Sequence, residues 1–277
     1  MKSPSRIPRA ALQFLACLCL LPSISCDGDQ RGGGVDAGDD GCQVTARLIY
    51  AIDSNDTLYR FDPEQEQFFA IGGIDCGNGS GPISMSVTRD AVAHVLFEDG
   101  AMYEVSTVDA SCASTPFSGG ASGFETFGMG YATDGPDTFD ETLYVAGEGG
   151  LGRVSDWAVE PVSPIDGEGI PELTGNSLGE LWGFFPGESP PRVARIDTAT
   201  GQLDDEESLP QLTGPPLAWA FAQWGGDFYI FYQAASDGST SVHRLDGRTG
   251  ELETLVPYTG KRIVGAGVST CAPAYIE

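Results

Sequence analysis

From residue 48 onward, short hydrophobic runs alternate with clusters of Gly, Asp, Pro and Ser, and almost no helical period is present. Runs of this length that are rich in Val, Ile, Tyr, Phe and Trp are typical of β-strands, and the polar clusters are typical of turns. A five-residue phrase recurs within this pattern: a hydrophobic residue, any residue, usually Arg, a hydrophobic residue, and then Asp or Ser. The five copies are Leu58–Asp62, Met102–Ser106, Leu151–Ser155, Val193–Asp197 and Val242–Asp246.

The copies are 44, 49, 42 and 49 residues apart, which is close to the length of one four-stranded propeller blade. Another strand candidate precedes each copy, and a turn such as 197–201 or 246–250 follows some of them. A strand that mixes small and large residues lies further upstream in units two to five, as an innermost strand requires. The pattern predicts an all-β fold, a five-bladed β-propeller of four-stranded antiparallel blades.

The two ends of the repeat region complement each other. The first unit begins at its second strand, residues 48–52, whereas residues 262–268 resemble an innermost strand with nothing after it. We therefore predict that the C-terminal strand completes blade one. Cys42 and Cys271 stand just outside these two strands, and we predict a disulfide between them. Cys76 and Cys112 would then pair across blades one and two.

The N-terminal region predicts export. Residues 1–25 combine three basic residues with an apolar run, 10–21, that is too short to span a membrane, as in a secretory signal. Cleavage before Cys26 would resemble processing of a bacterial lipoprotein, which makes Cys26 the lipidation candidate, although Ser25 also suits an ordinary signal peptidase. The expected location is the periplasm or the cell surface.

Residues 26–41 are rich in Gly and Asp and cannot bury enough apolar area to fold, so they predict a flexible tether. The propeller then occupies residues 42–277. Once Cys17, Cys19 and Cys26 are set aside, four Cys remain, an even number that suits two disulfides in an exported chain.

The chain is strongly acidic, with 40 Asp and Glu against 14 Lys and Arg and a net charge of −26. Such a surface repels nucleic acid and anionic lipid. We therefore expect no nucleic-acid partner, and membrane contact only through a lipid anchor. Attraction of basic proteins and simple solubility in a salty medium are both open explanations of the charge.

Two sequence motifs resemble catalytic signatures without their structural context. Gly147–Gly152 matches the dinucleotide pattern GxGxxG, and Gly175–Gly179 matches the GxSxG of serine hydrolases. Both signatures need a helix to follow, and here each motif lies between two predicted strands. Because His94 and His243 also lie inside predicted strands, neither is placed to activate Ser177.

An acidic loop in blade three is the weak metal candidate. Asp134, Asp137 and Asp140, followed by Glu141, could supply oxygen ligands for Ca²⁺. The spacing is not that of an EF-hand loop, and a solvated acidic loop explains it equally. We expect no metal and no other cofactor.

Glycoside hydrolysis is the enzymatic alternative, since several five-bladed families bring carboxylates from different blades to the mouth of the channel. The reaction needs two carboxyl groups about 5 to 10 Å apart. The connections into the innermost strands supply Glu125, Glu168 and Glu172, and Glu125 with Glu172 is the weak candidate pair.

Aromatic residues offer a noncatalytic alternative. Trp182 and Trp219 lie in the two adjacent blades that carry the longest loops, and with Tyr131 they are the candidate ligand-binding residues. Core packing explains each of them as well. Exposure at one mouth of the channel would distinguish the two explanations.

Two segments, residues 217–221 and 263–271, resemble those of exported bacterial lipoprotein-type β-propellers of unassigned role. This resemblance covers most of the exported chain and implies no catalytic residues. The sequence thus favours a monomeric, noncatalytic module at the cell envelope that binds an unidentified protein or glycan. The alternatives are a carbohydrate-active enzyme and a structural envelope component.

Overall fold

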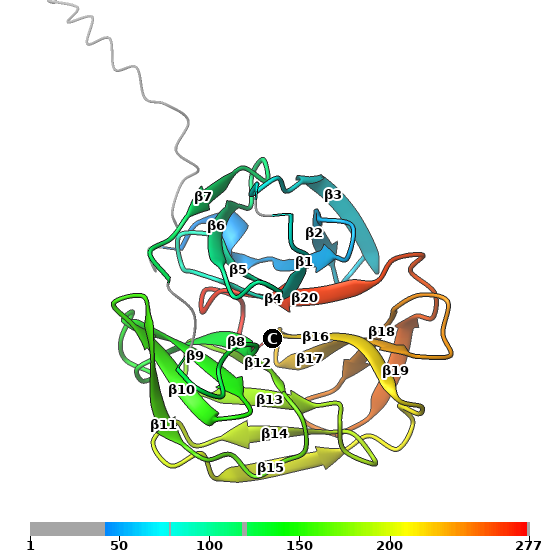
Figure 1. Cartoon of the computed structure of the whole chain (residues 1–277). Helices are drawn as coiled ribbons and strands as arrows, with labels where there is room; N and C mark the ends of the chain where they lie inside the picture. The colour runs from blue at the N-terminus through cyan, green and yellow to red at the C-terminus, as the bar shows by residue number, and fades with distance from the viewer. Residues whose placement is uncertain (1–41, 78, 118–120, 276–277) are drawn as a thin grey trace, which may run out of the picture. The chain divides into compact units, whose positions relative to one another are not determined.

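The computed structural model describes residues 42–77, 79–117 and 121–275. The predicted signal, the predicted tether and Cys26 lie outside this part of the chain. The described residues form five four-stranded antiparallel sheets arranged in a ring, a five-bladed β-propeller (Figure 1). The fold class predicted from the sequence is therefore confirmed.

Each blade runs from an innermost strand near the axis to an outermost strand at the rim. In that order, blade one contains β20 (Ile263–Gly267), β1 (Ile49–Asp53), β2 (Thr57–Asp62) and β3 (Gln67–Gly73), and blade two contains β4 (Pro82–Val87), β5 (Val92–Phe97), β6 (Met102–Ser106) and β7 (Cys112–Ser114). Blade three contains β8 (Gly128–Thr133), β9 (Glu141–Gly147), β10 (Gly150–Ser155) and β11 (Ala158–Ser163). Blade four contains β12 (Glu172–Gly175), β13 (Leu181–Phe185), β14 (Arg192–Ile196) and β15 (Leu203–Ser208). Blade five contains β16 (Pro216–Trp224), β17 (Asp227–Ala234), β18 (Ser241–Leu245) and β19 (Leu252–Val256), and one short 3-10 helix, η1 (Val44–Arg47), precedes blade one.

The recurring phrase corresponds to the third strand of every blade, and its two hydrophobic positions pack in opposite directions. In blade one, Leu58 packs into the cluster shared with blade two, and Phe61 packs into the cluster shared with blade five. Positions three residues apart on a strand point to opposite faces. Because a blade is covered on both faces by its neighbours, this spacing suits the fold, and the same arrangement repeats around the ring.

The Arg of the phrase is held by the outermost strand. Arg153, Arg195 and Arg244 each form an ion pair with the acidic residue opposite them on that strand. Arg60 instead lies over the ring of Phe69, which is its cross-strand partner. These exposed pairs neutralise part of the acidic rim.

The Asp that ends three copies of the phrase closes the next turn. Oδ1 of Asp197 accepts hydrogen bonds from the backbone amides of Ala199 and Thr200 at 3.0 and 2.8 Å. Asp62 and Asp246 make the same pair of bonds in their own blades. Such turns let a short side chain satisfy two amides that the sheet leaves free.

Glycines allow the innermost strands to approach each other closely. A Cβ on Gly130 would lie 2.9 Å from the carbonyl carbon of Leu173 and the amide nitrogen of Thr174 in the next blade. A Cβ on Gly267 would lie 2.9 Å from the Cα of Ser86. Neighbouring blades therefore meet backbone to backbone near the axis.

The ring closes as the ends of the sequence predict. Strand β20 pairs with β1, so the C-terminal strand completes blade one. Cys42 and Cys271, 229 residues apart in sequence, form a disulfide. Cys76 and Cys112 form a second one between blades one and two. Both predicted pairings are confirmed, and two disulfides indicate an oxidising, exported compartment.

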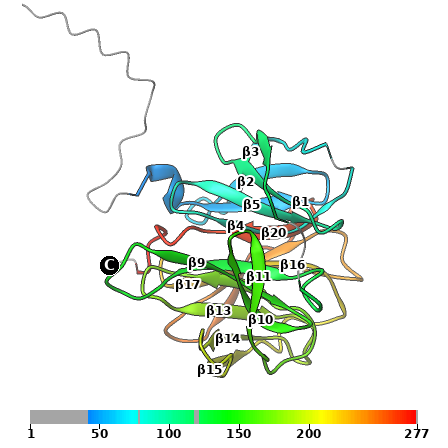
Figure 2. The same cartoon turned by 60° about the vertical axis from the view of Figure 1, so that its left-hand side comes forward.

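The two faces of the propeller differ in what they carry. We call the face on which the innermost strands begin the mouth face, and the opposite one the entry face. Cys42 packs against Cys271, which follows β20, and against Ala91 in the turn after β4, so the chain enters the propeller on the entry face. Figure 2 shows η1 in blue and the segment after β20 in red on the same side of the molecule.

Candidate functional site

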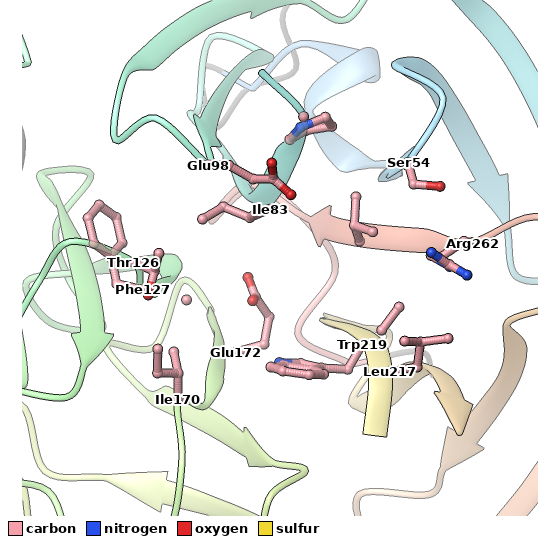
Figure 3. A pocket seen from close by; sticks show the side chains of 15 residues that line it. Ser54, Ile83, Glu98, Thr126, Phe127, Ile170, Glu172, Leu217, Trp219 and Arg262 are labelled. Atoms are coloured by element: carbon pink, nitrogen blue, oxygen red, sulfur yellow. The ribbon is translucent and has the colours of Figure 1, made fainter. Parts of the chain in front are cut away.

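A cavity of about 380 Å³ lies at the mouth face, where the first residues of all five innermost strands converge (Figure 3). Turns between second and third strands add Ser54 and Glu98 to its rim. The wall mixes apolar side chains with a few polar and charged ones. This composition is typical of a small-molecule site. We call it the mouth cavity, and its side chains are Ser54, Pro82, Ile83, Glu98, Thr126, Phe127, Ile170, Glu172, Leu217, Ala218, Trp219, Arg262 and Val264.

Glu172, the first residue of β12, lies at the centre of the mouth cavity in Figure 3. Its side chain is only 2% exposed, and its Oε1 accepts a hydrogen bond of 2.5 Å from the hydroxyl of Ser84 in blade two. Burial raises the pKa of this carboxyl well above its usual value, although the bonds from Ser84 and from the Met129 backbone oppose the shift. A neutral carboxylic acid is thereby favoured, which can both donate and accept hydrogen bonds.

Trp219 contributes an aromatic surface beside Glu172 (Figure 3). It lies in β16, is half-buried, and lines the mouth cavity beside Leu217, which is 43% exposed. The indole packs in part against the core between blades four and five and also lines the cavity. A half-buried tryptophan beside an exposed leucine offers a ligand apolar contact area.

Two charged residues of opposite sign complete the cavity wall. Arg262 and Glu98 are both exposed. Arg262 directly precedes β20, and Glu98 directly follows β5. The amide of Ser54 donates to the carbonyl of Arg262 at 2.8 Å, and the amide of Glu98 donates to the carbonyl of Gly81 at 2.9 Å. These bonds fix both backbones, so the two side chains project from rigid positions.

The structure brings two of the predicted site residues together at this cavity, Glu172 and Trp219. Glu125 is exposed and accepts a hydrogen bond from the amide of Gly123 in its own loop, and it does not line the mouth cavity. Glu168 is also absent from that wall. The predicted pair Glu125 and Glu172 therefore does not share this cavity.

The predicted aromatic group is divided between different places. Trp182 lines a second cavity of about 330 Å³ on the entry face, and its Nε1 is buried with no hydrogen-bond partner among the described residues. Tyr131 is nearly buried, and its hydroxyl is 2.8 Å from Nδ1 of His94. Trp182, Trp219 and Tyr131 thus form no common patch.

The weak metal candidates lie in the turn between β8 and β9, on the entry face. Asp134 accepts a hydrogen bond from the hydroxyl of Thr142, and its amide bonds to the carbonyl of Asp140. In the part of the chain that the structure describes, no group of three or more His, Cys, Asp or Glu is placed to hold a metal ion.

The two false catalytic motifs are turns. Gly147–Gly152 joins β9 to β10, and Gly175–Gly179 leads from β12 towards β13, so neither is followed by a helix. His243 contacts Ser241 at 2.8 Å, but the hydroxyl of Ser241 donates to the carbonyl of Tyr232. Burial lowers the pKa of His243 to about 4. This pair is part of the blade structure.

Glu98 and Arg262 are the site residues that sequence reasoning missed. Neither belongs to a recognisable motif. The signal that could have found them is positional, because Glu98 directly follows a second strand and Arg262 directly precedes an innermost one. In an antiparallel blade these two positions meet at the same face.

The fold and this cavity define a five-bladed β-propeller with a cavity at its mouth face. Among solved structures, a chain of a nidogen/laminin complex is similar, at 13% identity and a TM-score of 0.48, over 79% of this chain and 97% of that one. A protein of unknown function from Bacteroides thetaiotaomicron VPI-5482 is similar at 16% identity and a TM-score of 0.48, over 80% of this chain and 60% of the other. A third, from Bacteroides caccae and also of unknown function, has 12% identity and a TM-score of 0.38, over 74% and 70% of the two chains. No family model and no curated protein matches the sequence.

Proposed function

We propose that this protein is an exported, lipid-anchored β-propeller that serves as a noncatalytic binding module at the cell envelope and takes a small ligand in the mouth cavity. The observation that carries the proposal is the cavity itself. It joins all five blades, has the size of a small-molecule site, and combines a half-buried indole with buried and exposed polar groups.

The position of the chain entry supports this role. Cys42 lies on the entry face, and the mouth cavity opens on the other one. A tether that ends at a lipidated Cys26 would hold the entry face towards the membrane and leave the mouth cavity open to the surroundings. No helix within the described ranges has the length and apolarity needed to cross a membrane.

Two measurements test the two parts of the proposal. Metabolic labelling with a palmitate analogue should mark the wild-type chain and leave the Cys26→Ser variant unlabelled. Binding should be screened with a small-molecule and glycan library, in which the Trp219→Ala variant loses affinity and the Trp182→Ala variant keeps it. Trp182 is the matched control because it lines the entry-face cavity and not the mouth cavity. Equal affinity for both variants would place the ligand elsewhere and refute the mouth cavity as the binding site.

A second candidate function, carbohydrate hydrolysis, is favoured by one observation. The mouth cavity holds two carboxyl groups in different settings, Glu172 buried with a raised pKa and Glu98 exposed. Retaining and inverting glycosidases use such a pair as acid and as base or nucleophile. Release of nitrophenol from nitrophenyl glycosides by the wild type, abolished in Glu172→Gln, would support this alternative over simple binding.

A further inference from the structure

The mouth cavity contains an arginine, Arg262, whose guanidinium has no partner in the described part of the chain. Although acidic residues outnumber basic ones 40 to 14, the guanidinium of Arg262 makes no ion pair and no side-chain hydrogen bond with any described residue. Every arginine of the recurring phrase is instead engaged by the outermost strand of its blade. Arg60 also lacks a carboxylate partner, but its guanidinium lies over the ring of Phe69, whereas that of Arg262 has no such contact within the described ranges.

Glu98 is its counterpart of opposite charge on the cavity wall. Within the described ranges, its carboxylate also has no cation and no side-chain hydrogen bond. Figure 3 shows Glu98 and Arg262 on different sides of the mouth cavity, with Glu172 and Trp219 along the wall that faces them. The two charges therefore do not satisfy each other, and both remain available to a ligand.

The third ionisable group adds no opposing charge. Burial of Glu172 favours its neutral form. The cavity thus offers one positive and one negative group, in addition to apolar contacts from Trp219, Leu217 and Ile83. A neutral ligand would leave both charges unused, and a purely anionic or cationic ligand would face one repulsive group.

We propose that the ligand of the mouth cavity is a zwitterion of the size of one or two amino acids, a free amino acid or short peptide with an apolar side chain. Its carboxylate binds the guanidinium of Arg262 and its ammonium group binds the carboxylate of Glu98. The apolar side chain lies against Trp219 and Leu217. This inference rests on the proposed function, because it names the ligand class of the same cavity.

Volume and charge both agree with this ligand class. A cavity of about 380 Å³ is near the lower end of the range for small-molecule sites, roughly 300 to 1,000 Å³, and so selects a compact ligand. A guanidinium and a carboxylate frequently form two parallel hydrogen bonds, which makes arginine well suited to bind the carboxylate of a ligand. Arg262 and Glu98 are both exposed, so each charge stays hydrated until a ligand binds.

The test is calorimetric titration of the purified exported chain with L-leucine, L-phenylalanine and Leu-Leu. Two blocked analogues probe each charge: leucinamide lacks the carboxylate and N-acetyl-leucine lacks the ammonium group. We expect Arg262→Gln to weaken binding of the preferred zwitterion at least about tenfold, as loss of a charged hydrogen bond does. We expect Glu98→Gln to do the same.

Matched pairs separate recognition from a general structural effect. Arg262→Gln should not weaken binding of leucinamide and should raise its residual affinity, because that cation lacks the group that Arg262 binds and is repelled by the guanidinium. Glu98→Gln should likewise not weaken binding of N-acetyl-leucine, an anion that the Glu98 carboxylate repels. If either substitution weakens its blocked analogue as much as it weakens the zwitterion, the charge assignment is wrong.

Neutral sugars in the same titrations distinguish the two levels of the proposal. A sugar that binds in a Trp219-dependent way, while no zwitterion binds, would overturn the inference and preserve the proposed function. If neither zwitterions nor sugars bind in a way that depends on Trp219, the inference and the mouth cavity as a binding site both fail.

Discussion

Removal of the ring-closing disulfide should cost more stability than removal of the other one. The Cys42–Cys271 bond spans 229 residues and the Cys76–Cys112 bond spans 36. In the chain-entropy model a cross-link stabilises by restricting the unfolded chain, by ~5.4 kcal/mol for the longer loop and ~3.8 kcal/mol for the shorter. The model predicts a difference of ~1.6 kcal/mol between the two losses. The deeper burial of Cys42 and Cys271 adds a packing loss in the same direction.

The measurement is equilibrium urea unfolding of the wild type and of two double variants, Cys42→Ala with Cys271→Ala and Cys76→Ala with Cys112→Ala. The second double variant is the matched control, because it also removes two sulfurs and one disulfide. Hydrogen exchange should in addition show lost protection in β20, whose covalent link to the start of blade one is the bond removed. An equal or smaller loss for the ring-closing pair, with β20 still protected, would refute the view that this bond secures the ring.

Three further perturbations test the axis and the buried titratable groups. Gly130→Ala should destabilise the fold by ~1–3 kcal/mol through overpacking, because its Cβ would meet backbone atoms of the next blade at 2.9 Å. Gly73→Ala is the control and should not destabilise the fold, because its Cβ would have no neighbour closer than 4.0 Å. Equal urea midpoints for the two variants would contradict the close approach. Glu172 binds its proton more tightly when folded, so its contribution to stability is lost as pH rises from about 4.5 towards its raised folded pKa. Glu172→Gln should therefore flatten the decline of the melting temperature with pH over this range. An unchanged dependence of the melting temperature on pH would argue against the raised pKa. His243, with a folded pKa of about 4, binds its proton more weakly when folded than when unfolded, so stability should fall as pH drops from about 6.5 to about 4. The His243→Gln variant should lose part of this pH dependence of stability. An identical pH profile for the variant and the wild type would show that His243 is not the group responsible.

The fold could be predicted from the sequence because one local constraint repeats. A third strand that is covered on both faces needs hydrophobic residues at two positions that point in opposite directions. Leu58 and Phe61 meet this need in blade one, as Val242 and Leu245 do in blade five. The turn Asp at the end of the phrase marks the strand boundary. Each of these signals lies within a few consecutive residues, so it can be recognised without knowing how the blades pack.

The candidate site could be predicted only in part, because its residues carry no local signal. Trp219 and Glu172 drew attention as rare or chemically versatile residue types. Trp182 drew the same attention, yet it lines a cavity on the opposite face. Trp182 lies near the start of a second strand and Trp219 near the start of an innermost one, and these two kinds of strand run antiparallel, so their starts lie on opposite faces. Composition and motif alone could not separate the two tryptophans.

The same reasoning explains why the charge pattern becomes informative only in three dimensions. Among 14 basic residues and 40 acidic ones, nothing in the sequence marks Arg262 as different from Arg195 or Arg244. Cross-strand register places an acid opposite each of the latter two. Arg262 instead precedes an innermost strand at the mouth face, where Ser54, which directly follows the second strand of that blade, bonds to it only through its backbone amide. The fold thus satisfies its rim arginines internally and leaves at the channel mouth a cation that an incoming carboxylate can bind.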